Sequence, residues 1–368
     1  MLEPEDGTQL AEYQLISFWL GGNSGSVDIA IRLPKAPNNM RNALTLAICL
    51  FLNFTIKGQT GQENGMFDEL ERNSWYLPTA DGKARLYITS LGRGDTVVSL
   101  HGGPGNNFNY LVDAVRGSTD STCFVLFDQR GSLYSRVQDS SVRDLSLDIL
   151  VDDLESLRKE IGQEKLTLFA HSFGTVLAIS YYLKYPQNVR GMVLTASMPP
   201  FIPRGKTFID LVPEFHKRIK ALRNRPEVEA ILRDEGLWEE EGLNKKQQSD
   251  RYKITGLASF NMIDLRNWRS FKGGRAFFNS AVEGAIGGSM PESYDIRPTL
   301  ERFPITISII QGTEDYLSAD SWKLISDLLD HVSVHLIEHS SHYIWLDRAE
   351  EFNHILSSSF PWNRNRQE

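Results

Sequence analysis

The sequence is poor in the residues that build disulfide frameworks and zinc centres. Only two of its 368 residues are cysteines, Cys49 and Cys123, which excludes a disulfide-rich scaffold and a cysteine-rich zinc site. Cys123 lies in the apolar run STCFVLF, so it is predicted to be a small core residue of a strand. His339 and His342 lie in loop-like sequence rather than at metal-binding spacing on one element. We therefore expect neither a metal nor a cofactor.

An excess of basic residues is also missing. The chain has 39 lysines and arginines against 47 aspartates and glutamates, a net charge of −8. Nucleic-acid-binding proteins need a basic face to meet phosphates, so the composition argues against nucleic acid as a partner. The hydrophobic share of 41% and the charged share of 23% are ordinary for a soluble globular protein. The length suits one large α/β domain with an insertion, or two small domains.

Long apolar stretches are scarce, and one near the N-terminus is too short to span a bilayer comfortably. It is ALTLAICLFLNFTI, which follows Met40 and Arg41 and ends in a small and polar segment. This order is typical of a bacterial secretory signal. We therefore expect a signal peptide over 40–61 and an exported protein, with 1–39 as an extension that a start at Met40 would leave untranslated. The alternative is a buried or amphipathic helix in a cytoplasmic protein.

From about residue 75 the chain alternates short apolar runs with helical patterns. Apolar positions recur three and four residues apart over 146–162, as in an amphipathic helix, and Pro186 ends a second helical pattern that begins at 173. The predicted strands lie at 84–92, 96–103, 123–131, 165–172 and 189–197. Strands alternating with helices predict an α/β fold with a mostly parallel sheet covered by helices on both faces.

The alternation stops at MPPFIPRG and resumes at FPITISIIQG. Between them the chain is charged and largely helical in pattern. We therefore predict a core made of residues 66–200 and 294–362, interrupted by a helical cap over 201–293. No internal repeat is present.

Ser172 is the first candidate for chemistry. A serine hydroxyl is a weak nucleophile at neutral pH and needs a base, a group that orients the base, and donors for the oxyanion. The sequence KLTLFAHSFGTVLAI places Ser172 between a strand and a helix, with Ala170 and Gly174 as small neighbours two residues away. A sharp strand-to-helix turn needs such neighbours, since larger side chains would collide. The alternative is an ordinary turn whose serine caps the helix.

The motif HGGPG supplies the candidate oxyanion loop. It follows a predicted strand and consists of His101, Gly102, Gly103, Pro104 and Gly105. Its glycines leave backbone N–H groups free at the carboxyl edge of the sheet. The predicted donors are the N–H groups of Gly103 and of Phe173, the residue after the nucleophile.

The acid and base candidates follow later strands. Asp315 comes after TISIIQG, with Glu314 and Asp320 as competitors, and His342 precedes the last helix, with His339 as its competitor. The chain order serine, aspartate, histidine is the order of the α/β-hydrolase fold.

The motifs HGGPG, DQRGS, HSFGTVLA, GTED and SSHYIW together resemble α/β-hydrolases of the proline iminopeptidase group of serine peptidases, from about Trp75 to Trp362. The resemblance implies an α/β-hydrolase fold with a helical cap, a catalytic triad of Ser172, Asp315 and His342, and an oxyanion hole at HGGPG. Two departures are Ala170 in place of the first elbow glycine, and Leu133 and Tyr134 after DQRGS.

The family also holds the free amino terminus of its substrate with glutamates of the cap. Glu239, in the only Trp-Glu pair of this cap, and Glu283 are the candidates for this role. Glu239 lies in the charge run LWEEEG, for which the alternative is a solvated helix face.

We therefore predict a serine hydrolase whose cap closes a largely apolar pocket over a small peptide or ester. The preferred activity is an aminopeptidase that releases N-terminal residues, above all proline, from short peptides. The alternatives are a carboxylesterase or small-amide hydrolase of the same fold and, more remotely, a non-catalytic binding protein on a hydrolase scaffold. The oligomeric state is left open by the sequence.

Overall fold

The computed structural model describes residues 13–18, 27–32, 66, 68–212, 214–272, 279–360 and 362. It divides into two units, Met1–Asp68 and Glu69–Glu368. The described part of the first unit is an antiparallel hairpin of β1 (Tyr13–Phe18) and β2 (Val27–Arg32). The predicted signal peptide at 40–61 lies outside the described residues.

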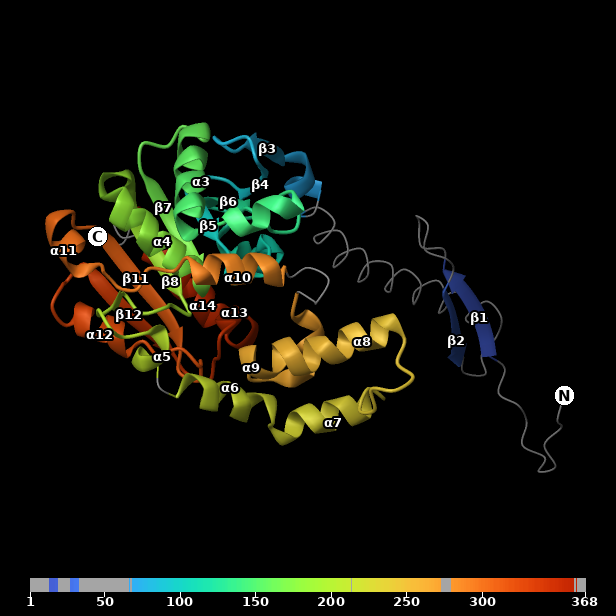
Figure 1. Ribbon diagram of the computed structural model, residues 1–368. Coiled ribbons are helices and arrows are strands. Elements are labelled where there is room, and N and C mark those ends of the chain that lie inside the picture. Colours follow the sequence, from blue (N-terminus) through green and yellow to red (C-terminus); the bar gives the residue numbers. More distant parts are fainter. Residues whose placement is uncertain are drawn as a thin grey trace, which may run out of the picture. The chain divides into compact units, whose positions relative to one another are not determined.

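An eight-stranded sheet forms the core of the second unit, with the order β12-β11-β8-β7-β5-β6-β4-β3 (Figure 1). Its strands are β3 (Trp75–Pro78), β4 (Arg85–Gly92), β5 (Asp95–Leu100), β6 (Thr122–Phe127), β7 (Leu166–His171), β8 (Val189–Thr195), β11 (Thr306–Gly312) and β12 (Val332–Ile337). The strands from β6 to β12 across the sheet pair in parallel, and only β3 and β4 run antiparallel to their neighbours. The predicted α/β fold with a mostly parallel sheet is confirmed.

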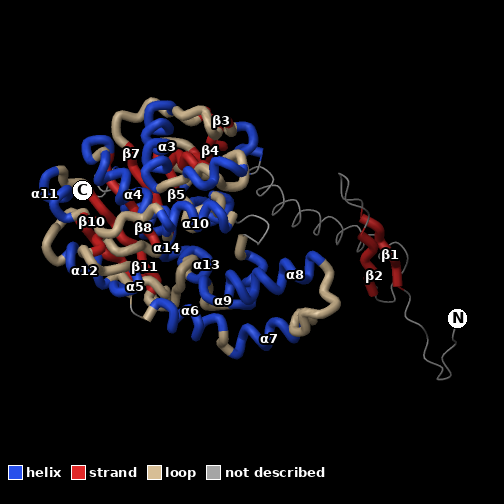
Figure 2. Tube along the Cα trace, in the orientation of Figure 1, coloured by secondary structure: helices blue, strands red, loops and turns tan. Residues whose placement is uncertain are grey.

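The helices around the sheet begin and end where local signals place them. The helix α3 (Leu147–Glu160) starts at Ser146, whose side chain accepts from the N–H of Ile149, and the chain turns at Gly162 with a positive φ. The helix α4 (Phe173–Lys184) ends just before Pro186. Figure 2 shows the strands enclosed by such helices. The others on the core are α2 (Leu111–Val115), α11 (Arg297–Arg302), α12 (Asp320–Ser326), α13 (Ile344–Asp347) and α14 (Ala349–Ser359).

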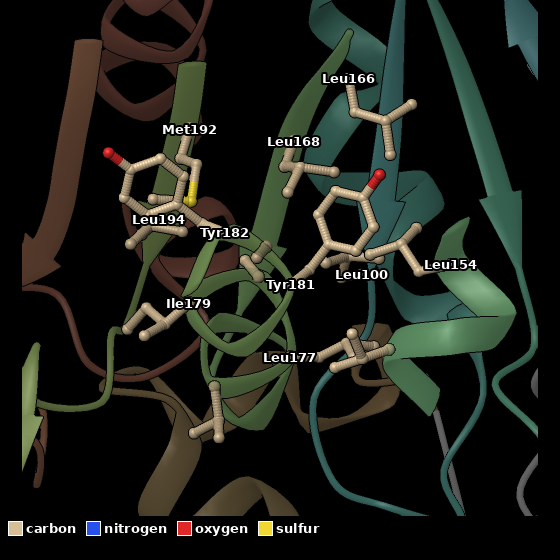
Figure 3. Close-up of a cluster of buried hydrophobic side chains, with 14 of the residues drawn as sticks. Leu100, Leu154, Leu166, Leu168, Leu177, Ile179, Tyr181, Tyr182, Met192 and Leu194 are labelled. Atoms are coloured by element: carbon tan, nitrogen blue, oxygen red, sulfur yellow. The ribbon is translucent and has the colours of Figure 1, made fainter. Parts of the chain in front are cut away.

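The helix α4 is buried on nearly every side, which ties the turn before it to the core. Leu177, Ile179, Tyr181 and Tyr182 of this helix are fully buried, and Figure 3 shows them among side chains of the neighbouring strands, such as Leu168. Truncating one such aliphatic side chain to alanine costs about 2–5 kcal/mol. The start of α4 is therefore held firmly against the edge of the sheet.

The insertion is closed at its base by a short ribbon. The strand β9 (Phe201–Ile202) pairs antiparallel with β10 (Tyr294–Asp295), which brings the two ends of the insertion together. Its helices are α5 (Phe208–Leu211), α6 (Phe215–Arg223), α7 (Pro226–Asp234), α8 (Lys245–Tyr252), α9 (Ser259–Asn261) and α10 (Ser280–Gly288). Figure 1 shows α6 to α9 as a group of helices beyond the sheet.

Two local predictions need correction. The helix α10 falls within the predicted cap, yet its Val282 and Ile286 are buried in the main core cluster, so it packs on the core. Cys123 is only half-buried in β6. None of the described helices is long and apolar enough to cross a membrane.

Candidate active site

Ser172 lies on a strained turn between β7 and α4. Its backbone has φ 54° and ψ −126°, a conformation that non-glycine residues rarely adopt and that costs about 1–3 kcal/mol. A Cβ on Gly174 would lie 2.2 Å from the carbonyl oxygen of Leu100, so only glycine fits there. Ala170 is fully buried in the core. The Ser172 side chain does not cap α4, so the capping alternative is wrong.

The HGGPG loop lies directly against this turn. A Cβ on Gly102 would lie 2.7 Å from the Cβ of Ser172, which explains the glycine. The N–H of Gly102 donates to the Tyr110 hydroxyl and is thereby occupied. Within the described chain, the N–H of Gly103 has no partner. Phe173 is the first residue of α4, so its N–H has no intrahelical acceptor. Pro104 has no N–H to offer.

His101, the first residue of the loop, bonds the loop to the neighbouring strand end. Its ring is buried, and Nε2 accepts from the N–H of Gln129 at 3.1 Å. The side-chain amide of Gln129 donates back to the His101 carbonyl at 2.7 Å. Burial lowers the pKa of His101 to about 4, so the ring is neutral near pH 7. These bonds join HGGPG to the DQRGS motif at the end of β6.

Asp315 and His342 form a buried pair at the ends of β11 and β12. The Nδ1 of His342 lies 3.0 Å from Oδ1 and 3.1 Å from Oδ2 of Asp315. Only 1% of Asp315 and 3% of His342 is exposed. Because a carboxylate only accepts, Nδ1 carries the proton and Nε2 is left as the basic nitrogen.

The Asp315 carboxylate receives two further hydrogen bonds. The N–H of Leu317 donates to Oδ1 at 3.0 Å, and the Gln311 side chain donates to Oδ2 at 2.7 Å. The other end of the Gln311 amide accepts from the N–H of Ser197, which fixes its orientation. Gln311 was missed in the sequence, although a polar residue inside the apolar run TISIIQG is a usable signal.

The competing acid and base residues lie on the surface. His339 is exposed, has φ 52°, and pairs with Glu314 at 3.5 Å. Asp320 is exposed at the start of α12, where its carboxylate accepts from the Ser318 hydroxyl. The structure therefore brings Asp315 and His342 together and separates both from their competitors.

The cap holds the loop that carries His342. The Asp347 carboxylate accepts from the N–H of Ser341 and from that of Ile263 in the cap, each at 2.9 Å. The N–H of Tyr343 donates to the Asn261 carbonyl at 3.0 Å. Burial raises the pKa of Asp347 to about 6. The residues on both sides of His342 are thus bonded to the segment 261–263 of the cap.

The serine turn contacts the base through the histidine that precedes Ser172. The ring of His171, the residue before Ser172, lies 4.7 Å from the His342 ring, centroid to centroid, and its Nε2 lies 3.1 Å from the His342 carbonyl oxygen. Within the described residues, Ser172 and His342 themselves share no hydrogen bond. Catalytic hydrogen bonds often tighten only when substrate binds.

A family model described as the alpha/beta hydrolase fold matches residues 95–349. The chain belongs to this family. The resemblance to its proline iminopeptidase group is also confirmed. A proline iminopeptidase of Saccharolobus solfataricus is 26% identical over 274 residues, which cover 72% of this chain and 84% of the relative. One of Thermoplasma volcanium is 25% identical over 271 residues, or 71% of this chain and 86% of the relative.

Solved structures agree on the fold of this α/β hydrolase. The proline iminopeptidase-related protein of Thermus thermophilus superposes with a TM-score of 0.55 at 24% identity, covering 78% of this chain and 96% of that structure. The proline iminopeptidase of Mycobacterium smegmatis gives a TM-score of 0.55 at 15% identity, with 80% and 100% coverage.

The two candidate amine-binding glutamates of this hydrolase occupy different surroundings. Glu239 is exposed in the connection between α7 and α8. Glu283 lies in the first turn of α10, next to Val282, whose side chain lies 3.2 Å from where a Cβ on Gly105 would be. The Glu283 side chain reaches solvent, and partial burial of its carboxyl group raises its pKa. Of the two, Glu283 is adjacent to the HGGPG loop.

The described part of the hydrolase contains no cluster of three or more His, Cys, Asp or Glu side chains that could hold a metal ion.

Proposed function

We propose that this protein is a serine hydrolase that works through an acyl-enzyme and releases N-terminal residues, proline preferred, from short peptides. The observation that carries the proposal is the buried Asp315–His342 pair, 3.0 Å from Nδ1 to Oδ1, beside the strained turn of Ser172. A carboxylate bonded to Nδ1 holds the imidazole in the orientation that leaves Nε2 toward the serine proton, and strain of this kind clusters at catalytic residues. Together they support nucleophilic catalysis by Ser172.

The proposed reaction begins with proton transfer from Ser172 to His342. The Nε2 of His342 takes the hydroxyl proton as Oγ attacks the scissile carbonyl carbon. The carbonyl oxygen becomes an oxyanion, which accepts from the N–H groups of Gly103 and Phe173. When the intermediate collapses, the C–N bond breaks and His342 returns the proton to the leaving amine. Asp315 stays ionised and stabilises the imidazolium.

Water then releases the acyl group. It occupies the place of the departed amine, and His342 removes its proton as the oxygen attacks the ester carbonyl. A second tetrahedral intermediate collapses to the free carboxylic acid, and the proton returns to Ser172. The two half-reactions use the same base and the same oxyanion donors.

The preference for short peptides rests on the relatives and on the residues around His342. The relatives from Saccharolobus solfataricus and Thermoplasma volcanium, 26% and 25% identical, are proline iminopeptidases. The Tyr316 ring stacks on the His342 ring at 4.4 Å between centroids, and it contacts the rings of Phe215 and Phe260 in the cap. An apolar wall of this kind suits the pyrrolidine ring of an N-terminal proline.

A carboxylesterase is the second candidate. It is favoured by the exposure of Glu239, because an aminopeptidase needs an enclosed carboxylate for the substrate amine and a solvated one contributes little. Under this alternative the triad works in the same way on an ester carbonyl.

The test compares proline arylamide, N-acetylproline arylamide and a short-chain ester. We expect Ser172→Ala to abolish hydrolysis of all of them, while Ser326→Ala at the end of α12 retains it. An aminopeptidase should lose nearly all activity when the amine is acetylated, since a carboxylate of the site is left unpaired. Indifference to the block would favour the esterase. Undiminished hydrolysis by Ser172→Ala would leave a binding protein or another mechanism.

We also propose that the protein is exported through the signal-like segment at 40–61. N-terminal sequencing of the purified mature protein tests this. A start near residue 62 supports export, and an intact Met1 contradicts it and favours the cytoplasm.

A further inference from the structure

A buried tyrosine and a buried histidine connect three parts of the site. The N–H of Gly102 donates to the Tyr110 hydroxyl at 2.5 Å, and that hydroxyl lies 2.8 Å from Nδ1 of His171. The Nε2 of His171 lies 3.1 Å from the His342 carbonyl oxygen. These contacts join the oxyanion loop, the serine turn and the loop of the base. The mechanism proposed above gives neither side chain a role.

The direction of each hydrogen bond follows from its ends. The His342 carbonyl oxygen only accepts, so Nε2 of His171 carries a proton. A neutral ring then has Nδ1 as an acceptor, and the Tyr110 hydroxyl must donate to it. The Tyr110 oxygen is thereby free to accept from the N–H of Gly102. Every donor has an acceptor in this chain of bonds.

The surroundings keep His171 in this neutral form. The ring is buried, and it contacts the rings of Tyr343 and Trp345, each at 5.1 Å between centroids. Burial first, and then the nearby His342, hold the pKa of His171 well below its ordinary value. A protonated ring could no longer accept from Tyr110, so neutrality preserves the direction of the bonds.

The other polar group of Gly102 is bonded as well. The Gly102 carbonyl oxygen lies 3.1 Å from Nδ1 of His101. Because Nε2 of His101 accepts from Gln129, Nδ1 carries the proton and donates to this oxygen. The carbonyl of Gly102 and the N–H of Gly103 belong to one planar trans peptide and point in opposite directions. Fixing Gly102 on both sides therefore fixes the direction of the Gly103 N–H.

We propose that Tyr110 and His171 are positioning residues that orient the Gly103 N–H and the loop of His342 relative to Ser172. The inference rests on the proposed serine mechanism. Tyr110 acts on the oxyanion donor through Gly102, and His171 acts on the base through its backbone. Both side chains are buried, so they act through the backbone and not on the substrate. Their loss should therefore lower kcat and leave KM nearly unchanged.

The first test is Tyr110→Phe, which removes one oxygen and leaves the ring. We expect kcat to fall about 10- to 100-fold, less than or comparable to removal of an oxyanion donor, with KM changed by less than about twofold. Tyr182→Phe is the matched control, because the Tyr182 hydroxyl on α4 also donates within the core, to the carbonyls of Thr299 and Phe303. It should shift the denaturation midpoint similarly and retain kcat.

The second test uses His171 and does not depend on the folding of Tyr110→Phe. Glutamine can accept at one end and donate at the other, whereas leucine can do neither. We expect His171→Gln to retain most of kcat and His171→Leu to lose it. Equal loss in both variants, or a Tyr110→Phe enzyme with wild-type kcat, would overturn the inference. Those results leave the serine mechanism intact if Ser172→Ala is inactive. An active Ser172→Ala would overturn both.

Discussion

The strand ends and the cap differ in how their charged groups are held. At the strand ends Asp315 is buried, with three donors on its carboxylate. In the cap, Arg233 and Glu229 form an exposed ion pair between residues one helical turn apart, and the Lys246–Asp250 pair has an exposed lysine. Exposed pairs contribute about 0–1 kcal/mol, whereas removing one partner of a buried pair costs about 3–5 kcal/mol.

The strand ends and the cap therefore have different tasks. The functional side chains at the strand ends are held in place by several constraints at once, namely the backbone, the nearby glycines and buried hydrogen bonds. Most charged groups of the cap are exposed, so solvent can replace their partners. Exceptions are the segment 261–263, which bonds to the loop of His342, and Arg218, whose guanidinium donates to the Asp315 carbonyl oxygen at 3.0 Å. Substitutions at the strand ends should therefore affect the chemical step, and most cap substitutions should affect which substrate is accepted.

The largest expected effect is that of Asp315→Asn. The amide would favour the wrong tautomer of His342, and kcat should fall about 10³- to 10⁴-fold. Steady-state kinetics on the preferred substrate measures this. Glu314→Gln, one residue away on the surface, should change kcat by less than about twofold. Similar losses in both variants would erase the distinction between the buried acid and its exposed neighbour.

Gly174→Ala should cause the next largest change. Its Cβ would lie 2.2 Å from the Leu100 carbonyl oxygen, so β5 or α4 must move, at a cost of about 1–3 kcal/mol. Gly284→Ala on α10 meets nothing within 4 Å and should stabilise the protein by about 0.5–1 kcal/mol. Urea denaturation of both variants gives the comparison. Loss of stability in Gly284→Ala alone would contradict it.

Asp347, which joins cap and core, should make stability depend on pH. The pKa of Asp347 in the folded protein is about 6, above the ordinary 3.8. The protonated carboxyl therefore makes its full contribution to stability below pH 4, and this contribution is lost as pH rises through 6. Between pH 4 and pH 7 the unfolding free energy of the wild type should fall by about 2 kcal/mol relative to Asp347→Asn. Denaturant titrations across this range test it. Asp327→Asn, on an exposed turn, should show the same pH dependence of the unfolding free energy as the wild type. If Asp347→Asn also showed the wild-type pH dependence, the role given to Asp347 would be refuted.

The smallest effects concern Glu283 on α10 and Glu239 in the cap. If Glu283 holds the substrate amine, Glu283→Gln should raise KM about tenfold, or about 1.4 kcal/mol, for free-amine substrates and leave acetylated ones unaffected. Glu239→Gln should change neither, because the side chain is solvated. A reversed pattern would assign the amine to the outer end of the cap.

Much of the core was predictable because its signals are local. Ser172, with a strand before it and small residues around it, and HGGPG, two predicted strands upstream, each carry their steric reason in the adjacent residues. The chain order of Ser172, Asp315 and His342 then limited the fold. Tyr110, His171 and Asp347 were not found, since each acts through a partner distant in sequence. The position of α10 on the core was also missed, because its apolar face resembles that of a cap helix.

By itself the sequence determined the alternation of strands and helices, the sharp turn at Ser172 and the place of the insertion, because these depend on residues within a few positions of one another. Only the tertiary structure decided which acid meets which base. Asp315 and Glu314 are adjacent in the chain, yet one is buried against His342 and the other is exposed beside His339. Burial and hydrogen-bond partners distinguish such neighbours, and both arise only when distant strands are brought to one edge of the sheet.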